Sequence, residues 1–163
     1  MTKSLHHMAF RCRDSEETRA FYEEVIGLPL AAALELDTSA TGRPVHALHT
    51  FFAIRDGSFL AFFEVPDQAF DFKPQHDFDL HVALDADEAS VEAAVAAARA
   101  RGLEVRGPSD HKFIRSTYFR DPNGYVVELA VRTPASPEIM ADQQRTARDV
   151  LAAWSRGPLP AGA

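Results

Sequence analysis

The pattern of hydrophobic and polar residues repeats once along the chain, with one copy at about residues 5–65 and the other at about 78–132. Each copy starts with strand formers. It continues with residues 16–26 or 88–101, where apolar side chains recur at helical spacing and a glycine follows. Three further strand-like stretches complete each copy. The pattern predicts two β-α-β-β-β units in an α+β protein.

Matched residues support this duplication. The segments that begin at His7 and His81 share the order histidine, apolar residue, alanine, apolar residue. Each half also ends on a strand with one acid among hydrophobic residues, Glu64 in the first half and Glu128 in the second. Several matched features in the same order indicate an internal repeat.

The last two strands of the second half form a clear hairpin signal. Residues 113–119 are rich in aromatic and β-branched side chains, and residues 125–131 form a second such stretch after the turn sequence Asp-Pro-Asn-Gly at 121–124. Glu128 interrupts the second stretch, and a carboxylate is costly to bury unless a cation meets it. We interpret that cation as a metal ion.

A different pattern begins after residue 134. Ser136 and Pro137 are typical of a helix start, and the apolar residues that follow lie along one broad side of the predicted helix. We therefore expect one domain over residues 1–134, and an amphipathic helix with its tail over 135–163. The helix should cover a cavity mouth or a dimer partner.

Composition narrows the partners and the compartment. The formal net charge of −7 over 163 residues, with no tract rich in Lys and Arg, argues against nucleic acid or an anionic membrane surface. No apolar stretch approaches the roughly 20 residues of a membrane span, and the N-terminus shows no signal-peptide core. A cytoplasmic homodimer that binds a small molecule is expected, without disulfides because Cys12 is the single cysteine.

The repeat also suggests how the candidate ligands meet. A pseudo-two-fold axis between the halves would bring their first strands together and place their last strands beside the same cavity. His7, His81 and Glu128 would then converge, with Glu64 as a candidate fourth ligand. Two imidazoles and a carboxylate with open positions suit Fe(II), and suit Mn, Ni or Zn almost as well.

These residues resemble the vicinal oxygen chelate superfamily, which includes glyoxalase I, bleomycin resistance proteins, epimerases and type I extradiol dioxygenases. The resemblance covers about residues 5–132 and is carried by the motifs around His7, Phe21-Tyr22 before Ile26-Gly27-Leu28, His81, and Asp121-Pro122-Asn123-Gly124 ahead of Glu128. It implies an eight-stranded, mixed, cup-shaped sheet around a metal site.

The resemblance leaves three functions open. His111 and Tyr118 resemble the His and Tyr of small catechol 2,3-dioxygenases, which implies Fe(II), an aromatic diol as substrate, acid–base catalysis by His111 and a hydrogen bond from Tyr118. Glu64 as a fourth ligand and base would instead resemble a glyoxalase- or epimerase-type isomerase or lyase using Ni or Zn. The third alternative is a metal-free binding protein similar to the bleomycin resistance proteins.

Overall fold

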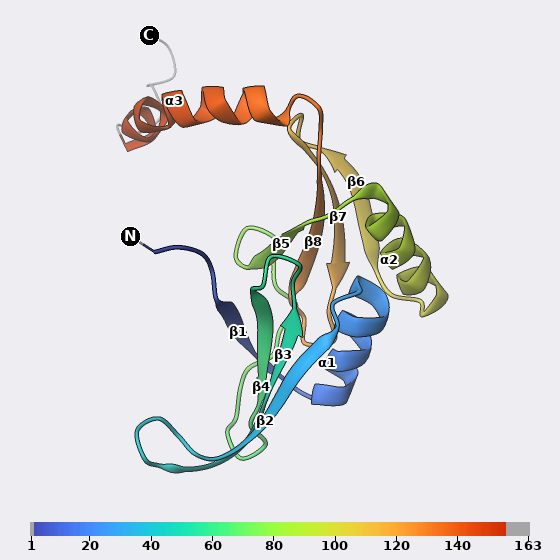
Figure 1. Ribbon diagram of the computed structural model, residues 1–163, viewed down its shortest axis with the longest axis vertical. Helices are drawn as coiled ribbons and strands as arrows, with labels where there is room; N and C mark the ends of the chain where they lie inside the picture. Colours follow the sequence, from blue (N-terminus) through green and yellow to red (C-terminus); the bar gives the residue numbers. More distant parts are fainter. Residues whose placement is uncertain (1, 156–163) are drawn as a thin grey trace.

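The computed structural model describes residues 2–155, and these form two successive units with the same order of elements followed by one helix (Figure 1). The first unit comprises β1 (His7–Cys12), α1 (Ser15–Phe21), the π-helical turn η1 (Tyr22–Ile26), β2 (Leu30–Thr38), β3 (Pro44–Ala53) and β4 (Phe59–Glu64). The second comprises β5 (His81–Asp85), α2 (Glu88–Ala100), β6 (Val105–Asp110), β7 (Ile114–Arg120) and β8 (Val126–Arg132). Helix α3 (Ser136–Ser155) follows. The predicted pair of β-α-β-β-β units and the predicted final helix are confirmed.

The eight strands are hydrogen-bonded as two four-stranded sheets, in the orders β1-β4-β3-β2 and β5-β8-β7-β6. In each sheet the first strand of the unit runs parallel to the last, and the other neighbours are antiparallel. The sheets are therefore mixed, as expected. Helices α1 and α2 lie on one side of the sheets, and α2 packs against η1, so the opposite sheet faces are left open (Figure 1).

Local sequence explains where the helices begin and end. The side chain of Asp14 accepts a hydrogen bond from the backbone N–H of Glu17 at 2.8 Å, and Asp87 accepts one from Ser90 at the same distance. Such contacts satisfy N–H groups that have no partner inside the helix. Gly27 ends η1 with φ of 85°, a left-handed conformation that favours glycine.

Buried polar contacts join the two units. The hydroxyl of Tyr22 donates to Asp121 Oδ2 at 3.1 Å, the side-chain amide of Asn123 donates to Thr18 Oγ1 at 3.2 Å, and the backbone N–H of Arg13 donates to Asn123 Oδ1 at 2.8 Å. The turn before β8 is thus fixed against the first helix. This contact sets the relative position of the two sheets.

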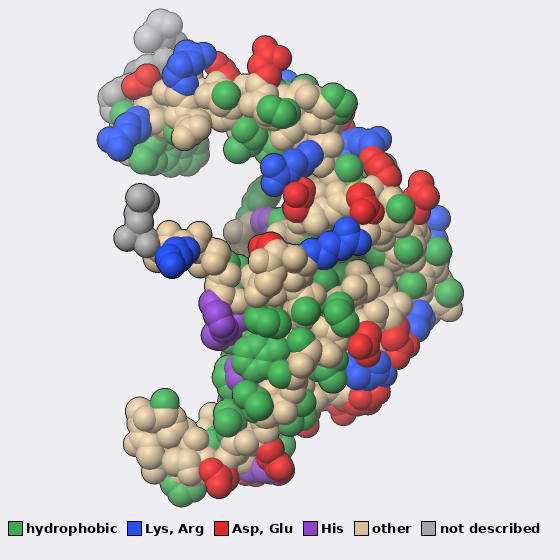
Figure 2. Space-filling model, in the orientation of Figure 1, with side chains coloured by type: hydrophobic (Ala, Val, Ile, Leu, Met, Phe, Trp, Pro, Cys, Tyr) green, Lys and Arg blue, Asp and Glu red, His purple; other side chains and the backbone are tan. Residues whose placement is uncertain are grey.

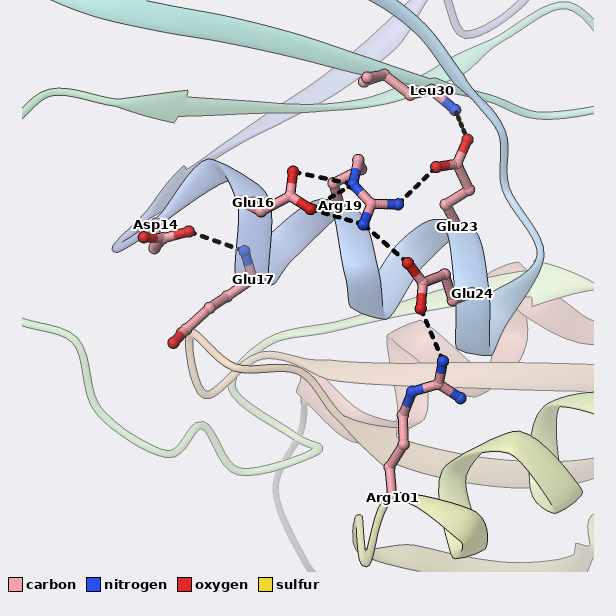
Figure 3. A network of polar contacts seen from close by, with 8 residues as sticks. All are labelled: Asp14, Glu16, Glu17, Arg19, Glu23, Glu24, Leu30 and Arg101. Carbon is pink, nitrogen blue, oxygen red and sulfur yellow. Dashed lines mark hydrogen bonds and ion pairs between the residues drawn. The ribbon is translucent and has the colours of Figure 1, made fainter.

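A surface network of charges supports the same junction (Figure 3). Arg19 donates to Glu16, Glu23 and Glu24, and Glu24 in turn accepts from Arg101 at the end of α2, at 2.7 Å. These side chains are exposed or half-exposed, so each pair contributes modestly to stability.

Helix α3 leaves the end of β8 and projects beyond both sheets (Figure 1). After its first turn its side chains are almost all exposed, including those of Met140, Leu151 and Trp154. Within residues 2–155, no helix combines the length and hydrophobicity that crossing a membrane requires.

Candidate metal centre

One face of the second sheet gathers polar side chains from three strands. In the parallel pairing of β5 with β8, Ala83 lies beside Glu128, and His81 is two residues before Ala83. Because side chains alternate along a strand, His81 and Glu128 share a face. Tyr118 lies opposite Glu128 on β7 and faces the same side, as does Ser116 two residues earlier. The second sheet therefore assembles four polar residues on one surface.

The contact between His81 and Glu128 carries the argument for a cation. Nδ1 of His81 lies 2.6 Å from the backbone oxygen of Asp77, which can only accept, so Nδ1 must donate. The neutral imidazole then has its lone pair on Nε2, which lies 3.3 Å from Oε2 of Glu128. A lone pair facing a carboxylate oxygen needs a proton or a metal ion between them. A ligand histidine that donates its other N–H to a carbonyl is the usual arrangement at metal sites.

Further contacts fix both groups in place. Ser116 Oγ donates to Oε1 of Glu128 at 2.5 Å, and both side chains are buried, with 0% and 5% exposure. Arg106 donates to both carboxylate oxygens of Asp77, at 2.7 and 3.0 Å, and so anchors the residue whose backbone oxygen holds His81. The pair is preorganised, with Oε2 of Glu128 and Nε2 of His81 directed at one point.

His111 and Tyr118 lie together at the rim of the same face. Nε2 of His111 is 3.1 Å from the Tyr118 hydroxyl, and the Arg106 guanidinium lies 5.2 Å from the centre of the Tyr118 ring. The turn that carries His111 contains Lys112 at φ of 71°, which is rare for a residue other than glycine. The structure thus brings together four predicted site residues on one sheet: His81, Glu128, His111 and Tyr118.

The open face of the first sheet is mostly aromatic. The ring of His7 lies 5.6 Å from that of Phe51 and 6.2 Å from that of His49, and His49 stacks on Phe63 with ring centres 3.6 Å apart. Burial lowers the pKa of His49, which keeps its ring neutral near pH 7. Figure 2 shows histidine side chains among hydrophobic ones on this side of the molecule. This face offers His7 and the neutral His49 beside a flat apolar wall.

Within one chain, His7 does not join His81 and Glu128. Across the described residues 2–155, no three His, Cys, Asp or Glu side chains lie close enough to hold one metal ion. The expected triad is therefore divided, with two members on the second sheet and His7 on the first.

Glu64 also lies apart from this pair. Its Oε2 accepts a hydrogen bond from the backbone N–H of Ser15 at 2.7 Å, at the beginning of α1. Glu64 pairs with Cys12 at the far end of β1, five residues from His7. In this structure the carboxylate of Glu64 supports a helix start and does not lie beside His81 and Glu128.

The sheet register explains this difference between the halves. The residue two places after His81 pairs with Glu128, whereas the residue two places after His7 pairs with Ala61. Ala61 is thus the structural counterpart of Glu128. The sequence comparison had matched Glu128 with Glu64, which is three residues further along β4. The first sheet carries the histidine of the pair without its acid.

Sequence reasoning missed three supporting residues, namely Ser116, Asp77 and Arg106. Ser116 could have been found, because it is two residues before Tyr118 in a strand and must share its face. Asp77 and Arg106 gave no signal, since they are 29 residues apart and meet only through the fold.

The duplicated unit, with a histidine and an acid on a parallel strand pair at an open sheet face, defines a class of cup-shaped α+β proteins that can hold a metal ion. A sequence model of the Glyoxalase/Bleomycin resistance protein/Dioxygenase superfamily matches residues 4–129. The chain belongs to this superfamily. The comparison with curated proteins gave no match.

Solved structures show the same fold. A glyoxalase/dioxygenase from Nostoc punctiforme is 26% identical, with a TM-score of 0.61 over 80% of this chain and 92% of its own. A mutant of the fosfomycin resistance protein FosX from Listeria monocytogenes, complexed with Mn(II) and 1S,2S-dihydroxypropylphosphonic acid, is 20% identical, with a TM-score of 0.62 over 84% and 98%. A glyoxylase/bleomycin resistance protein/dioxygenase domain from Frankia sp. EAN1pec is 14% identical, with a TM-score of 0.65 over 82% and 100%.

Proposed function

We propose that the chain is a metal-dependent enzyme whose ion is held by His81 and Glu128 of one copy and His7 of a second copy. The orientation of the His81 and Glu128 side chains toward one point supports the first two ligands. The separation of His7 from them within the chain, and the open faces of both sheets, support the second copy as the source of the third. A neutral imidazole pair with one carboxylate suits Fe(II), Mn(II), Ni(II) or Zn(II).

Subunit complementation tests the shared site. His7→Ala and His81→Ala should each bind Mn(II) weakly. When equal amounts of the two variants are unfolded and refolded together, about half of the dimers should be mixed. Each mixed dimer has one intact site and one with neither histidine, so roughly a quarter of all sites should bind Mn(II) as in the wild type. Recovery is impossible if both histidines must come from one chain. Full-strength binding by His7→Ala alone would also reject the proposal.

The proposed reaction is the opening of a catechol-like aromatic diol by dioxygen, as in the extradiol dioxygenases. A bound Fe(II) ion would supply coordination positions for the diol oxygens and the redox chemistry toward dioxygen. With substrate bound, the hydrogen bond between His111 Nε2 and the Tyr118 hydroxyl is exchanged: Nε2 accepts a proton from the diol and later returns it, and the Tyr118 hydroxyl turns to donate a hydrogen bond to the substrate oxygen. The His111–Tyr118 contact beside Glu128 is the observation that carries this assignment. The aromatic face around Phe51 fits a planar substrate.

The position of Glu64 argues against the isomerase alternative. That reaction requires Glu64 as ligand and base, yet its carboxylate accepts from Ser15 at the other end of the strand. In the metal-free binding alternative a proton would lie between His81 and Glu128, and that alternative gives no role to the His111–Tyr118 contact beside them. The dioxygenase therefore explains more of the site residues than either alternative.

Oxygen uptake tests the reaction. The protein is loaded with Fe(II) under anaerobic conditions and then mixed with oxygenated buffer and a panel of catechols. His111→Ala should lower kcat by about 10²–10⁴-fold, whereas His46→Ala, an exposed histidine on β3, should not change it. Glu64→Gln should keep wild-type uptake if folded. Absence of uptake with every diol, in protein that binds Fe(II), would reject the dioxygenase while leaving the shared metal site standing.

A further inference from the structure

Helix α3 lies outside the family fold, and among the described residues it has no packing partner along most of its length. The family model ends at residue 129, and α3 spans the 20 residues from Ser136 to Ser155. Figure 2 shows its side chains standing clear of the sheets. Most helical stability in proteins comes from packing of an apolar face, so an unpacked apolar face on α3 indicates a missing partner. The sequence of α3 indicates what packs against it.

Six residues form a narrow seam along α3, spaced alternately by three and four positions. They are Pro137, Met140, Gln144, Ala147, Leu151 and Trp154. This spacing is typical of helices that pair with another helix side by side. The side chains of Met140, Leu151 and Trp154 are 46%, 66% and 84% exposed. A hollow of about 540 Å³ lies along the first half of the seam, lined by Pro137, Met140 and Ala147 among others.

We propose that α3 pairs with α3 of a second copy of the chain in antiparallel orientation. Reversal of one helix places the six seam residues in three pairs, each of which occurs twice about the two-fold axis. The pairs are Pro137 with Trp154, Met140 with Leu151, and Gln144 with Ala147. The large Trp154 ring thus meets the small Pro137, and the polar Gln144 meets a small residue.

Charges beside the seam fit the same arrangement. Of the residues that flank the seam, Ala141, Gln143, Arg148 and Val150, only Arg148 is charged, so little charge is placed at the edge of the pair. The acids Asp142 and Asp149 lie on the opposite side of α3, away from the seam. A parallel pair would instead stack Trp154 on Trp154 and Gln144 on Gln144. The sequence is therefore self-complementary in the antiparallel register.

Within residues 2–155, no other element of the chain covers the seam. Only residues 133–135 separate β8 from α3, and α3 projects away from both sheets (Figure 1). A second copy is also what the divided metal site requires. The helix pairing itself rests on the seam alone, and it stands whether or not that site binds metal.

Disulfide trapping tests the pairing. In Met140→Cys/Leu151→Cys, the two introduced thiols oppose each other across the pair, and mild oxidation should give a covalent dimer. The matched control Asp142→Cys/Asp149→Cys has the same symmetry on the outer side and should give about tenfold less. The native Cys12 does not interfere, because it is buried and burial raises the pKa of its thiol. Equal trapping of the two variants, or no covalent dimer from the seam variant, would overturn the proposal.

The single variant Met140→Cys tests the orientation. In the antiparallel pair the two copies of residue 140 are roughly 16 Å apart along the axis, too far for a disulfide. A covalent dimer of this variant would therefore show a parallel pair and overturn the register. Adding His81→Ala to the seam variant should leave trapping unchanged, which separates failure of the pairing from failure of the metal site.

Trp154 supplies a second measurement, because it is the only tryptophan in the chain. Packing against Pro137 of the other copy should shift its emission to shorter wavelength than in water. Ala147→Glu places a charge in the seam and should return the emission to that of exposed tryptophan. Ala153→Glu makes the same change outside the seam and should keep the wild-type spectrum. A wild-type spectrum already identical to that of Ala147→Glu would contradict the pairing.

Discussion

Replacement of Ser116 by alanine isolates the contact that orients Glu128. The Ser116 hydroxyl donates to Oε1 at 2.5 Å, which leaves Oε2 as the oxygen directed at His81. Alanine removes this donor and little else, because both side chains are buried and the change in volume is small. The carboxylate of Glu128 then loses its donor and is free to rotate.

The size of the effect follows from the charge and burial of the contact. A hydrogen bond to a charged group contributes about 1.5–3 kcal/mol, and loss of a contact that orients a metal ligand weakens metal binding about 10–100-fold. A tenfold change corresponds to about 1.4 kcal/mol, so the two ranges agree. We expect Ser116→Ala to bind Mn(II) about 10–100-fold more weakly, and to unfold at lower urea concentration without metal.

Titration of Mn(II) followed by electron paramagnetic resonance measures the affinity directly, because free and bound ions give different signals. Ser109→Ala is the matched control: Ser109 lies opposite Ser116 in the sheet register but makes no hydrogen bond to Glu128 among the described residues. It should bind Mn(II) as the wild type does. If Ser116→Ala retains wild-type affinity within about twofold, the hydroxyl does not orient the ligand and the reasoning fails.

Two further predictions concern the stability of the second unit. Asp121→Asn should lower the free energy of unfolding by about 2 kcal/mol, measured in urea, because buried Asp121 accepts four hydrogen bonds and the amide can accept only part of them. The control Asp67→Asn, at an exposed position, should lower it by less than about 0.5 kcal/mol. Burial raises the pKa of Asp121, so the wild type loses stability as the pH rises above about 4. The difference in free energy of unfolding between the wild type and Asp121→Asn should therefore decrease over this pH range. An increase in that difference would contradict the reasoning. Lys112→Gly should raise the free energy of unfolding by about 1 kcal/mol, because Lys112 has φ of 71°, and Lys112→Ala should give no gain. An equal gain in both would show that the side chain, rather than the backbone, is the cause.

The order of elements could be predicted because its signals are local. Apolar spacing, the caps at Asp14 and Asp87, and the glycines after the helices each depend on a few neighbouring residues. The partnership of His81 with Glu128 could be predicted for two reasons. The repeat places the first and last strands of the halves beside one cavity, and Glu128 is an isolated acid in an apolar strand. These features needed no knowledge of how the strands pair.

Strand register was the feature that sequence could not supply. The motif around Glu64 looks like that around Glu128, yet β1 pairs with β4 so that Ala61, and not Glu64, lies beside the residue two places after His7. Parallel strands far apart in sequence are aligned by the elements between them, here a helix and two strands, and by core packing, and neither is visible in a short motif. For the same reason the contact between Arg106 and Asp77 could not be foreseen.

The difference between the two halves has a consequence for assembly. If both sheets carried a histidine and an acid, the two sheets would offer equivalent pairs of ligands. Instead the second sheet has His81 and Glu128, and the first has His7 with an aromatic wall and Ala61 where the acid would stand. A complete ligand set then needs one sheet of each kind face to face, while α1 and α2 hold the two sheets of one chain side by side with both faces open (Figure 1). Because His7 lies apart from His81 and Glu128 within the described residues, the proposed chemistry requires a second copy of the chain, and the wall beside His7 would then form the substrate side of the shared site.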